Sequence, residues 1–174
     1  MFTLVVGGAA SGKSEYAESL ILQSEHLPRY YIATMQPFDE ECLARIARHR
    51  EMRAAKKFET IECYTSLASV VLPRRGDVLL ECLGNLTANE LYSPEGAGAG
   101  AMEAITGGID GLLPQCENLV VVSNEVCSDG GGYSEETEQY RRLLAGVNRA
   151  LARRADRVCE VVCGVPCYSK GGIG

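Results

Sequence analysis

The chain has 174 residues, enough for one domain with a sizeable hydrophobic core. Hydrophobic residues make up 46% and charged residues 23%, which is typical of a globular protein and unlike a disordered one. The net charge of −6 argues against nucleic-acid binding, because affinity for a phosphate backbone requires a surplus of Lys and Arg. No apolar run reaches the roughly 18 residues that a membrane span needs. We therefore expect one domain over residues 1–174, with no membrane span and a local anion site.

The eight cysteines indicate a reducing compartment, because they form no C-x-x-C pair and no signal peptide precedes them. Three of them, Cys159, Cys163 and Cys167, recur every four residues near the C-terminus. Thiolates bind zinc, but this spacing is not that of a zinc module, and free cysteines are often small buried hydrophobes. We expect a cytoplasmic protein with free cysteines.

The N-terminal third alternates predicted strands and helices. An apolar run that ends in glycines predicts a strand, and apolar residues at helical spacing predict the helix that follows it. A charged segment without Gly or Pro predicts a second helix. In chain order the expected elements are a strand at 2–6, a helix at 13–23, a strand at 30–33, a helix at 39–57 and an extended piece at 59–63.

The rest of the chain continues the alternation. Residues 78–83 and 118–123 are continuous apolar runs, typical of strands buried on both faces of a parallel sheet. The helix between them is harder to place, because glycine is frequent in 93–100 and 106–108. A long helix is expected at 134–155 with Ser134 as its N-cap, and a last strand at 157–164.

Strands alternating with helices over the whole length predict right-handed βαβ crossovers. We therefore predict an α/β fold of the P-loop NTPase type (RecA-like), a mostly parallel sheet with helices on both faces. Ligands of such sheets bind beyond the carboxyl ends of the strands. The loops after Val6, Ala33, Leu80 and Ser123 are accordingly expected to converge on one crevice.

A phosphate-binding loop is the strongest signal in the sequence. The pattern G-x-x-x-x-G-K-[ST] is complete and lies between a predicted strand and a predicted helix. Small residues let backbone N–H groups wrap the phosphates, the helix N-terminus adds positive potential, and Lys13 neutralises the outer phosphates as a catalytic residue. The loop consists of Gly7, Gly8, Ala9, Ala10, Ser11, Gly12, Lys13 and Ser14.

A P-loop site also needs an acid at a neighbouring strand end to hold Mg²⁺. Glu81 follows a buried strand and is our candidate, with the Ser14 hydroxyl as the second metal ligand. Glu125 after the next strand is the competing candidate. A GTPase guanine-reading N-K-x-D motif would start at Asn124, but Glu125 stands where its Lys should be, which argues against a switch GTPase.

The predicted helix at 39–57 carries a cluster of basic residues. Arg45, His49 and Arg53 are spaced by four, so they share one helix face and could present a cationic surface with a histidine at its centre to phosphate. Arg-rich helix faces are usually only solvated. Spacing alone therefore leaves both readings open.

Taken together, these segments resemble the bifunctional adenosylcobinamide kinase and adenosylcobinamide-phosphate guanylyltransferase family of cobalamin biosynthesis. The distinguishing match is to its R-I-x-x-H-R…R…T-x-E pattern. The similar segments are the P-loop, Tyr31–Thr34, Ala44–Arg50 with Arg53, Thr60–Glu62, Leu79–Leu83, Asn89, Val122–Val126, Asn148 and Ala155–Asp156.

The resemblance implies phosphorylation of adenosylcobinamide, followed by GMP transfer from GTP to give adenosylcobinamide-GDP. It assigns His49 as the residue that takes GMP. It implies GTP and ATP as substrates, a corrinoid as the second substrate, and a homotrimer. The implied nucleotide contacts outside the P-loop are Thr34, Arg50, Arg53, Glu62 and Glu81.

Two segments depart from the family pattern. Val126 is followed by Cys127–Gly132 in place of G-x-G-I-V-P, and an R-x-F-R-D run is replaced by Glu138–Arg142. We expect these segments to shape the acceptor side, so the corrinoid preference is less determined than nucleotide binding. The alternatives are another small-molecule P-loop kinase without guanylyl transfer, and a non-catalytic nucleotide-sensing module.

Overall fold

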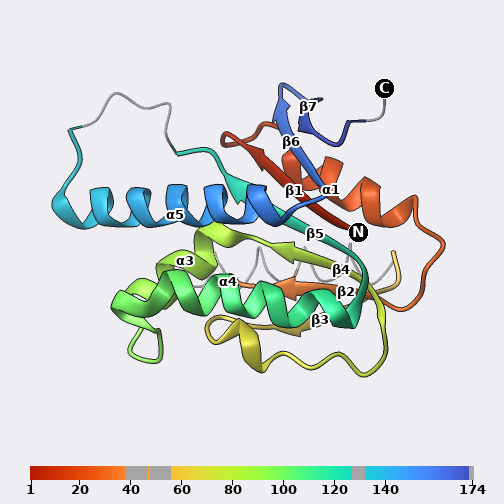
Figure 1. The fold of residues 1–174 in the computed structure, drawn as a ribbon, viewed down its shortest axis with the longest axis horizontal. Coiled ribbons are helices and arrows are strands. Elements are labelled where there is room, and N and C mark those ends of the chain that lie inside the picture. Colours follow the sequence, from red (N-terminus) through yellow and green to blue (C-terminus); the bar gives the residue numbers. More distant parts are fainter. Residues whose placement is uncertain (38–46, 48–55, 127–131, 173–174) are drawn as a thin grey trace.

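The computed structural model describes residues 1–37, 47, 56–126 and 132–172. Its seven strands form one sheet in the order β3-β2-β4-β5-β1-β6-β7 (Figure 1). In chain order they are β1 Phe2–Gly7, β2 Arg29–Ala33, β3 Phe58–Glu62, β4 Gly76–Glu81, β5 Cys116–Asn124, β6 Arg157–Val162 and β7 Val165–Lys170.

Strands β1 to β6 pair in parallel, and β7 pairs with β6 in the antiparallel direction. The parallel register brings the carboxyl ends of five strands to one edge. Gly7 is paired with Asn124, Glu81 with both Val122 and Ala33, and Ala33 with Glu62. The predicted convergence of the loops after these strands is thereby confirmed.

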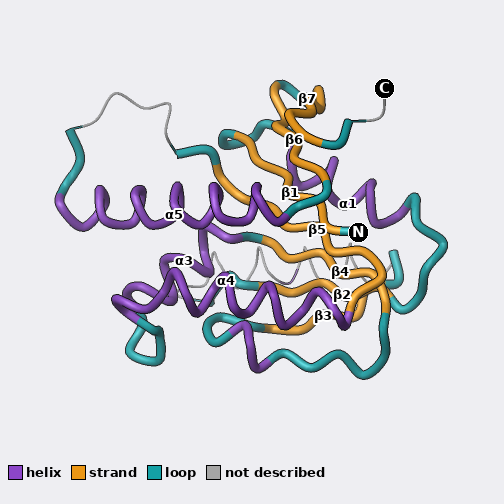
Figure 2. Tube along the Cα trace, in the orientation of Figure 1, coloured by secondary structure: helices purple, strands orange, loops and turns teal. Residues whose placement is uncertain are grey.

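Helices cover both faces of the sheet, as Figure 2 shows for the strand layer and its flanking helices. Alternate residues of a strand enter opposite cores: in β4, Val78 and Leu80 belong to one buried cluster and Leu79 to the other. One face carries α3 (Leu83–Tyr92), α4 (Ala101–Leu112) and α5 (Glu135–Arg154), and the other carries α1 (Lys13–Leu22).

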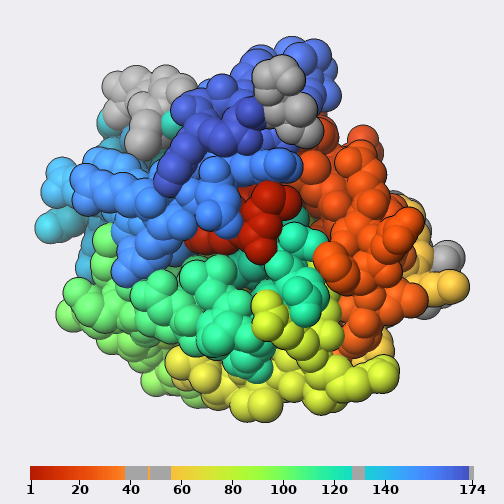
Figure 3. Space-filling view, turned by 45° about the vertical axis from the view of Figure 1, so that its right-hand side comes forward, coloured from red at the N-terminus to blue at the C-terminus, as the bar shows by residue number. Residues whose placement is uncertain are grey.

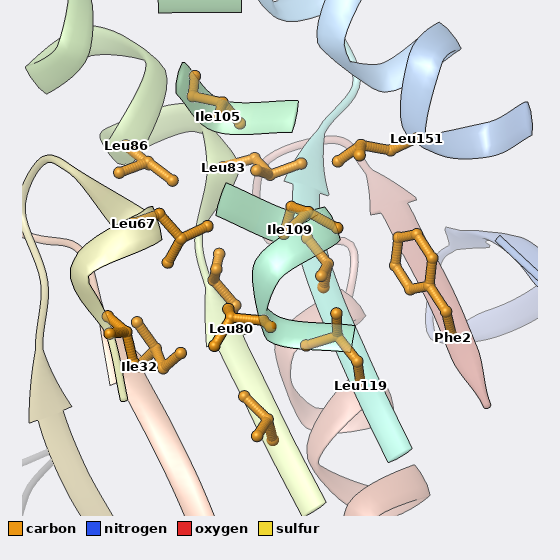
Figure 4. Packing of buried hydrophobic residues seen from close by; sticks show 14 of the residues in the cluster. Phe2, Ile32, Leu67, Leu80, Leu83, Leu86, Ile105, Ile109, Leu119 and Leu151 are labelled. Atoms are coloured by element: carbon orange, nitrogen blue, oxygen red, sulfur yellow. The ribbon is translucent and has the colours of Figure 1, made fainter. Parts of the chain in front are cut away.

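The larger core lies under the three helices α3, α4 and α5. Strand residues such as Leu80 and Leu119 pack against Leu83 of α3 and Ile109 of α4 (Figure 4). Figure 3 shows the N-terminal residues, in red, bordered by the C-terminal part of the chain and by its middle. Segments distant in sequence therefore share one core, and the predicted α/β fold of the P-loop NTPase type is confirmed.

Most predicted elements lie within two residues of those observed, and the Ser134 cap is confirmed because its Oγ accepts a hydrogen bond from Thr137 N. Short 3₁₀ helices also occur at Leu67–Ser69 (η1), Gly98–Gly100 and Leu113–Gln115. The prediction of a last strand at 157–164 is wrong in its end, because β6 stops at Val162 and a tight turn leads into β7. The predicted helix at 39–57 lies outside the described residues, except for Ala47, which is helical, and Lys56 and Lys57.

The three C-terminal cysteines do not converge. Cys159 is buried, whereas Cys163 and Cys167 are exposed, and all three are free thiols. Within the described ranges, no group of three or more His, Cys, Asp or Glu side chains is placed to hold a metal ion. None of the described helices is long and apolar enough to cross a membrane.

Two adjacent glycines in α4 provide a test of the packing. A Cβ on Gly108 would lie 2.7 Å from Leu67 Cβ, whereas a Cβ on Gly107 would meet nothing within 4 Å. Gly108→Ala should lower the free energy of unfolding by about 1–3 kcal/mol through overpacking. Gly107→Ala should raise it by about 0.5–1 kcal/mol, because alanine restricts the unfolded chain.

Urea denaturation of the two variants measures both changes. Equal effects of the two substitutions would contradict the close approach of α4 to η1.

Candidate nucleotide-binding site

The P-loop connects β1 directly to α1, and two of its glycines are required by geometry. Gly12, which caps α1, has φ of 87°, a conformation that L side chains rarely adopt. A Cβ on Gly7 would lie 2.5 Å from Ser11 Oγ and 2.9 Å from the carbonyl oxygen of Val161. The loop therefore turns back tightly over the end of its own strand.

Neighbouring strands hold this loop from two sides. On one side, Glu125 N donates to Gly7 O at 3.0 Å, just after the end of β5. On the other, Gly164 N in the β6–β7 turn donates to Ser11 O at 2.8 Å. Backbone hydrogen bonds to two neighbouring segments therefore fix the loop.

The side chains of the loop are arranged around a short, closed turn. Lys13 Nζ donates to Gly8 O at 2.9 Å, so the ammonium group caps the loop itself. Ser14 follows in the first turn of α1, where its backbone N–H belongs to the electropositive helix end. Ser11 Oγ is buried and has no hydrogen-bond partner within the described part of the chain.

Glu81 lies at the carboxyl end of β4, two strands from β1, which corresponds to about 10 Å at normal strand spacing. The phenol of Tyr31, a 7% exposed residue of β2, donates to Glu81 Oε2 at 2.9 Å. This bond fixes the carboxylate at the edge where the strand ends meet.

Glu81 and Lys13 act electrostatically on the same neighbour. Burial raises the pKa of the Cys82 thiol, the charge of Glu81 raises it further, and the charge of Lys13 lowers it. Both the P-loop lysine and the β4 carboxylate therefore lie near enough to Cys82 to act on its thiol.

Thr34 lies at the same edge, but its hydroxyl is already bonded. Its Oγ1 donates to Cys82 O and accepts from Cys82 N, both at 2.8 Å, and the residue is fully buried. Asn89 Nδ2 donates to Thr34 O at 2.8 Å and to Tyr64 O at 2.9 Å. Thr34 therefore links the ends of β2 and β4.

Glu62 ends β3, four strands from β1, which corresponds to about 19 Å. Its carboxylate is exposed at the sheet edge, and Tyr64 Oη donates to Glu62 Oε2 at 3.0 Å. The edge therefore carries the P-loop at β1, Glu81 two strands away and Glu62 at the far end. His49, Arg50 and Arg53, together with Arg45 of the same predicted helix face, lie outside the described residues.

The family comparison accounts for nearly the whole chain. A model of the family described as cobinamide kinase / cobinamide phosphate guanyltransferase matches residues 3–168. The chain belongs to this family. The resemblance seen in the sequence segments is confirmed.

Curated relatives match this chain over nearly their full length. A protein of Salmonella typhimurium (strain LT2), named bifunctional adenosylcobalamin biosynthesis protein CobU, is 37% identical over 182 residues, covering 95% of this chain and 97% of the relative. A relative of the same name from Escherichia coli (strain K12) is 35% identical and covers 95% of this chain and 97% of its own length. The similarity to these relatives therefore extends over nearly the whole of this chain.

A solved structure confirms the fold alone. The KaiC-like protein PH0186 of Pyrococcus horikoshii OT3 superposes with a TM-score of 0.51 at 12% identity, covering 91% of this chain and 71% of that one. The shared feature is the α/β layered arrangement.

Two features of this cobinamide kinase / guanyltransferase family member were not predicted as parts of the site. Tyr31 was predicted only as a strand residue, although a polar tip two residues before a strand end could have indicated a contact at the edge. The β6–β7 turn at Gly164 was missed because 157–164 was predicted as one strand.

The buried Thr34 hydroxyl is testable by an isosteric change. Thr34→Val would leave the Cys82 N–H without its acceptor, and we expect a loss of about 1–3 kcal/mol in unfolding free energy. Thr34→Ser keeps the oxygen and loses one methyl group, about 0.8 kcal/mol. Urea titrations give both values, and a Thr34→Val variant as stable as wild type would contradict the assigned link.

Proposed function

We propose that the protein carries out two successive reactions, phosphorylation of adenosylcobinamide and transfer of GMP to the resulting phosphate. The observation that supports this most directly is a P-loop already closed by backbone hydrogen bonds, in a chain of the cobinamide kinase / cobinamide phosphate guanyltransferase family. ATP and GTP are the proposed nucleotides, and the corrinoid is the acceptor.

In the first reaction the acceptor hydroxyl oxygen attacks the γ-phosphorus of the nucleotide. The bond to the β,γ-bridging oxygen breaks, the nucleoside diphosphate leaves, and the hydroxyl proton is released. The residues Gly8–Ser14 supply backbone N–H groups, and Lys13 exchanges Gly8 O for phosphate oxygens. Catalysis then consists mainly of positioning and charge neutralisation.

The oxygen ligands at this edge suit Mg²⁺, which is usually held by one or two protein oxygens together with substrate phosphates. Ser14 and Glu81 are the proposed protein ligands, and the metal would neutralise charge on the phosphates. Tyr31 keeps the Glu81 carboxylate in place through Oε2.

In the second reaction, His49 is the proposed nucleophile. An imidazole nitrogen attacks the α-phosphorus of GTP, pyrophosphate leaves, and a phosphorus–nitrogen bond to GMP forms. An oxygen of cobinamide phosphate then attacks the same phosphorus and the bond to nitrogen breaks. Arg50, Arg53, Thr34 and Glu62 are proposed to position the nucleotide, Thr34 through the strand link rather than its bonded hydroxyl.

We further propose a cytoplasmic enzyme, which the free thiols support. The homotrimer and the absence of nucleic-acid binding remain predictions from the resemblance and from the net charge of −6. Light scattering of the purified protein tests the first, and a mobility-shift assay with duplex DNA tests the second.

Lys13→Ala should remove both reactions, because each requires the triphosphate in the loop. We expect a loss of about 3 kcal/mol or more of transition-state stabilisation, at least roughly 100-fold in rate. Lys170→Ala, on β7, is the control, because its ammonium bonds only to Ala152 O and Arg153 O among the described residues. Near wild-type turnover of Lys13→Ala in either assay would remove the P-loop from the mechanism.

Glu81→Gln should raise the Mg²⁺ concentration needed for half-maximal turnover more than it weakens nucleotide binding, because the amide is a poor metal ligand. Glu125→Gln is the matched comparison, since Glu125 lies next to the P-loop strand. If the metal dependence shifts only in Glu125→Gln, the metal ligand is on β5.

His49→Ala should separate the two reactions. Imidazole, with its ordinary pKa of ~6.5, is mostly uncharged near neutral pH and can act as a nucleophile. We expect protein labelling by α-labelled GTP and formation of adenosylcobinamide-GDP to be lost, while γ-phosphoryl transfer to adenosylcobinamide persists. The wild-type label should be lost in acid and survive in base.

Labelling that persists in His49→Ala would contradict this assignment, and His26, the other histidine, would be the next candidate. Absence of labelling in the wild-type protein would instead favour a P-loop kinase without guanylyl transfer.

A further inference from the structure

A surface hollow lies between α3 and α5. Its volume is about 350 Å³, and the described residues that line it are Ala88, Tyr92, Glu136, Thr137 and Tyr140. This is within the size range of small-molecule sites, which span roughly 300–1,000 Å³. The volume is sufficient for part of a large ligand.

Packed side chains connect one wall of the hollow, Tyr140, with the carboxyl end of β1. A Cβ on Gly84 would lie 3.1 Å from Tyr140 Oη and 2.7 Å from Asn124 Nδ2. Asn124 is the register partner of Gly7, the last residue of β1. Tyr140, one wall of the hollow, therefore lies close to Gly84, whose other neighbour Asn124 pairs with the last residue of β1.

The walls are aromatic and held in place. Tyr92 is 50% exposed, and its hydroxyl donates to Glu136 O at 2.6 Å, which ties α3 to α5. Tyr140 packs against the main core, and burial raises the pKa of its phenol to about 12. Rigid rings of this kind give a large contact area at low entropy cost.

The charges around the hollow disfavour a second nucleotide. The first turn of α5 carries Glu135, Glu136 and Glu138, and the described lining residues include no Lys or Arg. Carboxylates repel a triphosphate. They suit a neutral or cationic ligand, such as a cobalt(III) corrinoid with its net positive charge and amide side chains.

We propose that the hollow between α3 and α5 binds one edge of the corrinoid acceptor and directs its hydroxyl toward the P-loop. The inference rests on the proposed function, and it locates the acceptor on this chain.

Two variants test the site in opposite ways. Ala88→Leu fills the hollow, and Tyr92→Ala removes one wall without exposing core, because Tyr92 is already half exposed. Each should raise the dissociation constant for adenosylcobinamide, measured by equilibrium dialysis from its visible absorbance, about tenfold or more. The KM for adenosylcobinamide in the kinase assay should rise in parallel.

Ala152→Leu is the matched control. Ala152 is also a half-buried helix residue, and it lines a different hollow of about 490 Å³ between α5 and β7. Its acceptor affinity should equal that of wild type. Labelling by α-labelled GTP needs no acceptor, so it should be unchanged in all three variants.

Folded Ala88→Leu and Tyr92→Ala proteins with wild-type acceptor affinity would overturn the inference, with melting temperatures as the check on folding. The proposed function fails separately, if wild-type protein neither phosphorylates adenosylcobinamide nor becomes labelled by α-labelled GTP.

Discussion

The tight closure of the P-loop over the end of β1 is the constraint on which the site depends. Gly7 has no space for a side chain between Ser11 and the Val161 carbonyl, and Gly164 closes the loop from the β6–β7 turn. These contacts come from strands at opposite ends of the sequence. The phosphate site therefore exists only when β1, β5 and β6 are paired, and the fold and the binding site form together.

Parallel register then distributes the proposed roles along one edge. The β1 end carries the phosphate loop, the β4 end carries Glu81 held by Tyr31, and the β3 end carries Glu62 held by Tyr64. In the proposed function, the phosphates and the metal lie near β1 and β4, and the rest of the nucleotide extends toward β3. The hollow between α3 and α5 lies on the helix-covered face, where Tyr140 links it to the strand ends through Gly84 and Asn124.

Sequence reasoning predicted what depends on local pattern. The apolar runs predicted the strands, the P-loop motif predicted the β1–α1 connection, and Ser134 predicted the start of α5. It did not predict contacts set by register, such as Tyr31 with Glu81, because pairing partners are distant in sequence. It also placed α4 poorly, since helix propensity counts Gly107 and Gly108 as breakers, whereas packing against Leu67 favours a small residue at Gly108. The turn after Val162 was missed because 157–164 was predicted as one strand, and β7, with Pro166, Ser169 and Lys170, was not predicted.

The proposed function requires that this loop receives the triphosphate and that the Lys13 ammonium exchanges Gly8 O for phosphate oxygens. The most direct measurement is a crystal structure with Mg²⁺ and a GTP analogue that cannot be hydrolysed. We expect phosphate oxygens within hydrogen-bond distance of the backbone N–H groups of residues 8–14, with Lys13 Nζ moved from Gly8 O to the outer phosphates. A bound nucleotide located elsewhere, with the bond from Lys13 to Gly8 intact, would contradict it.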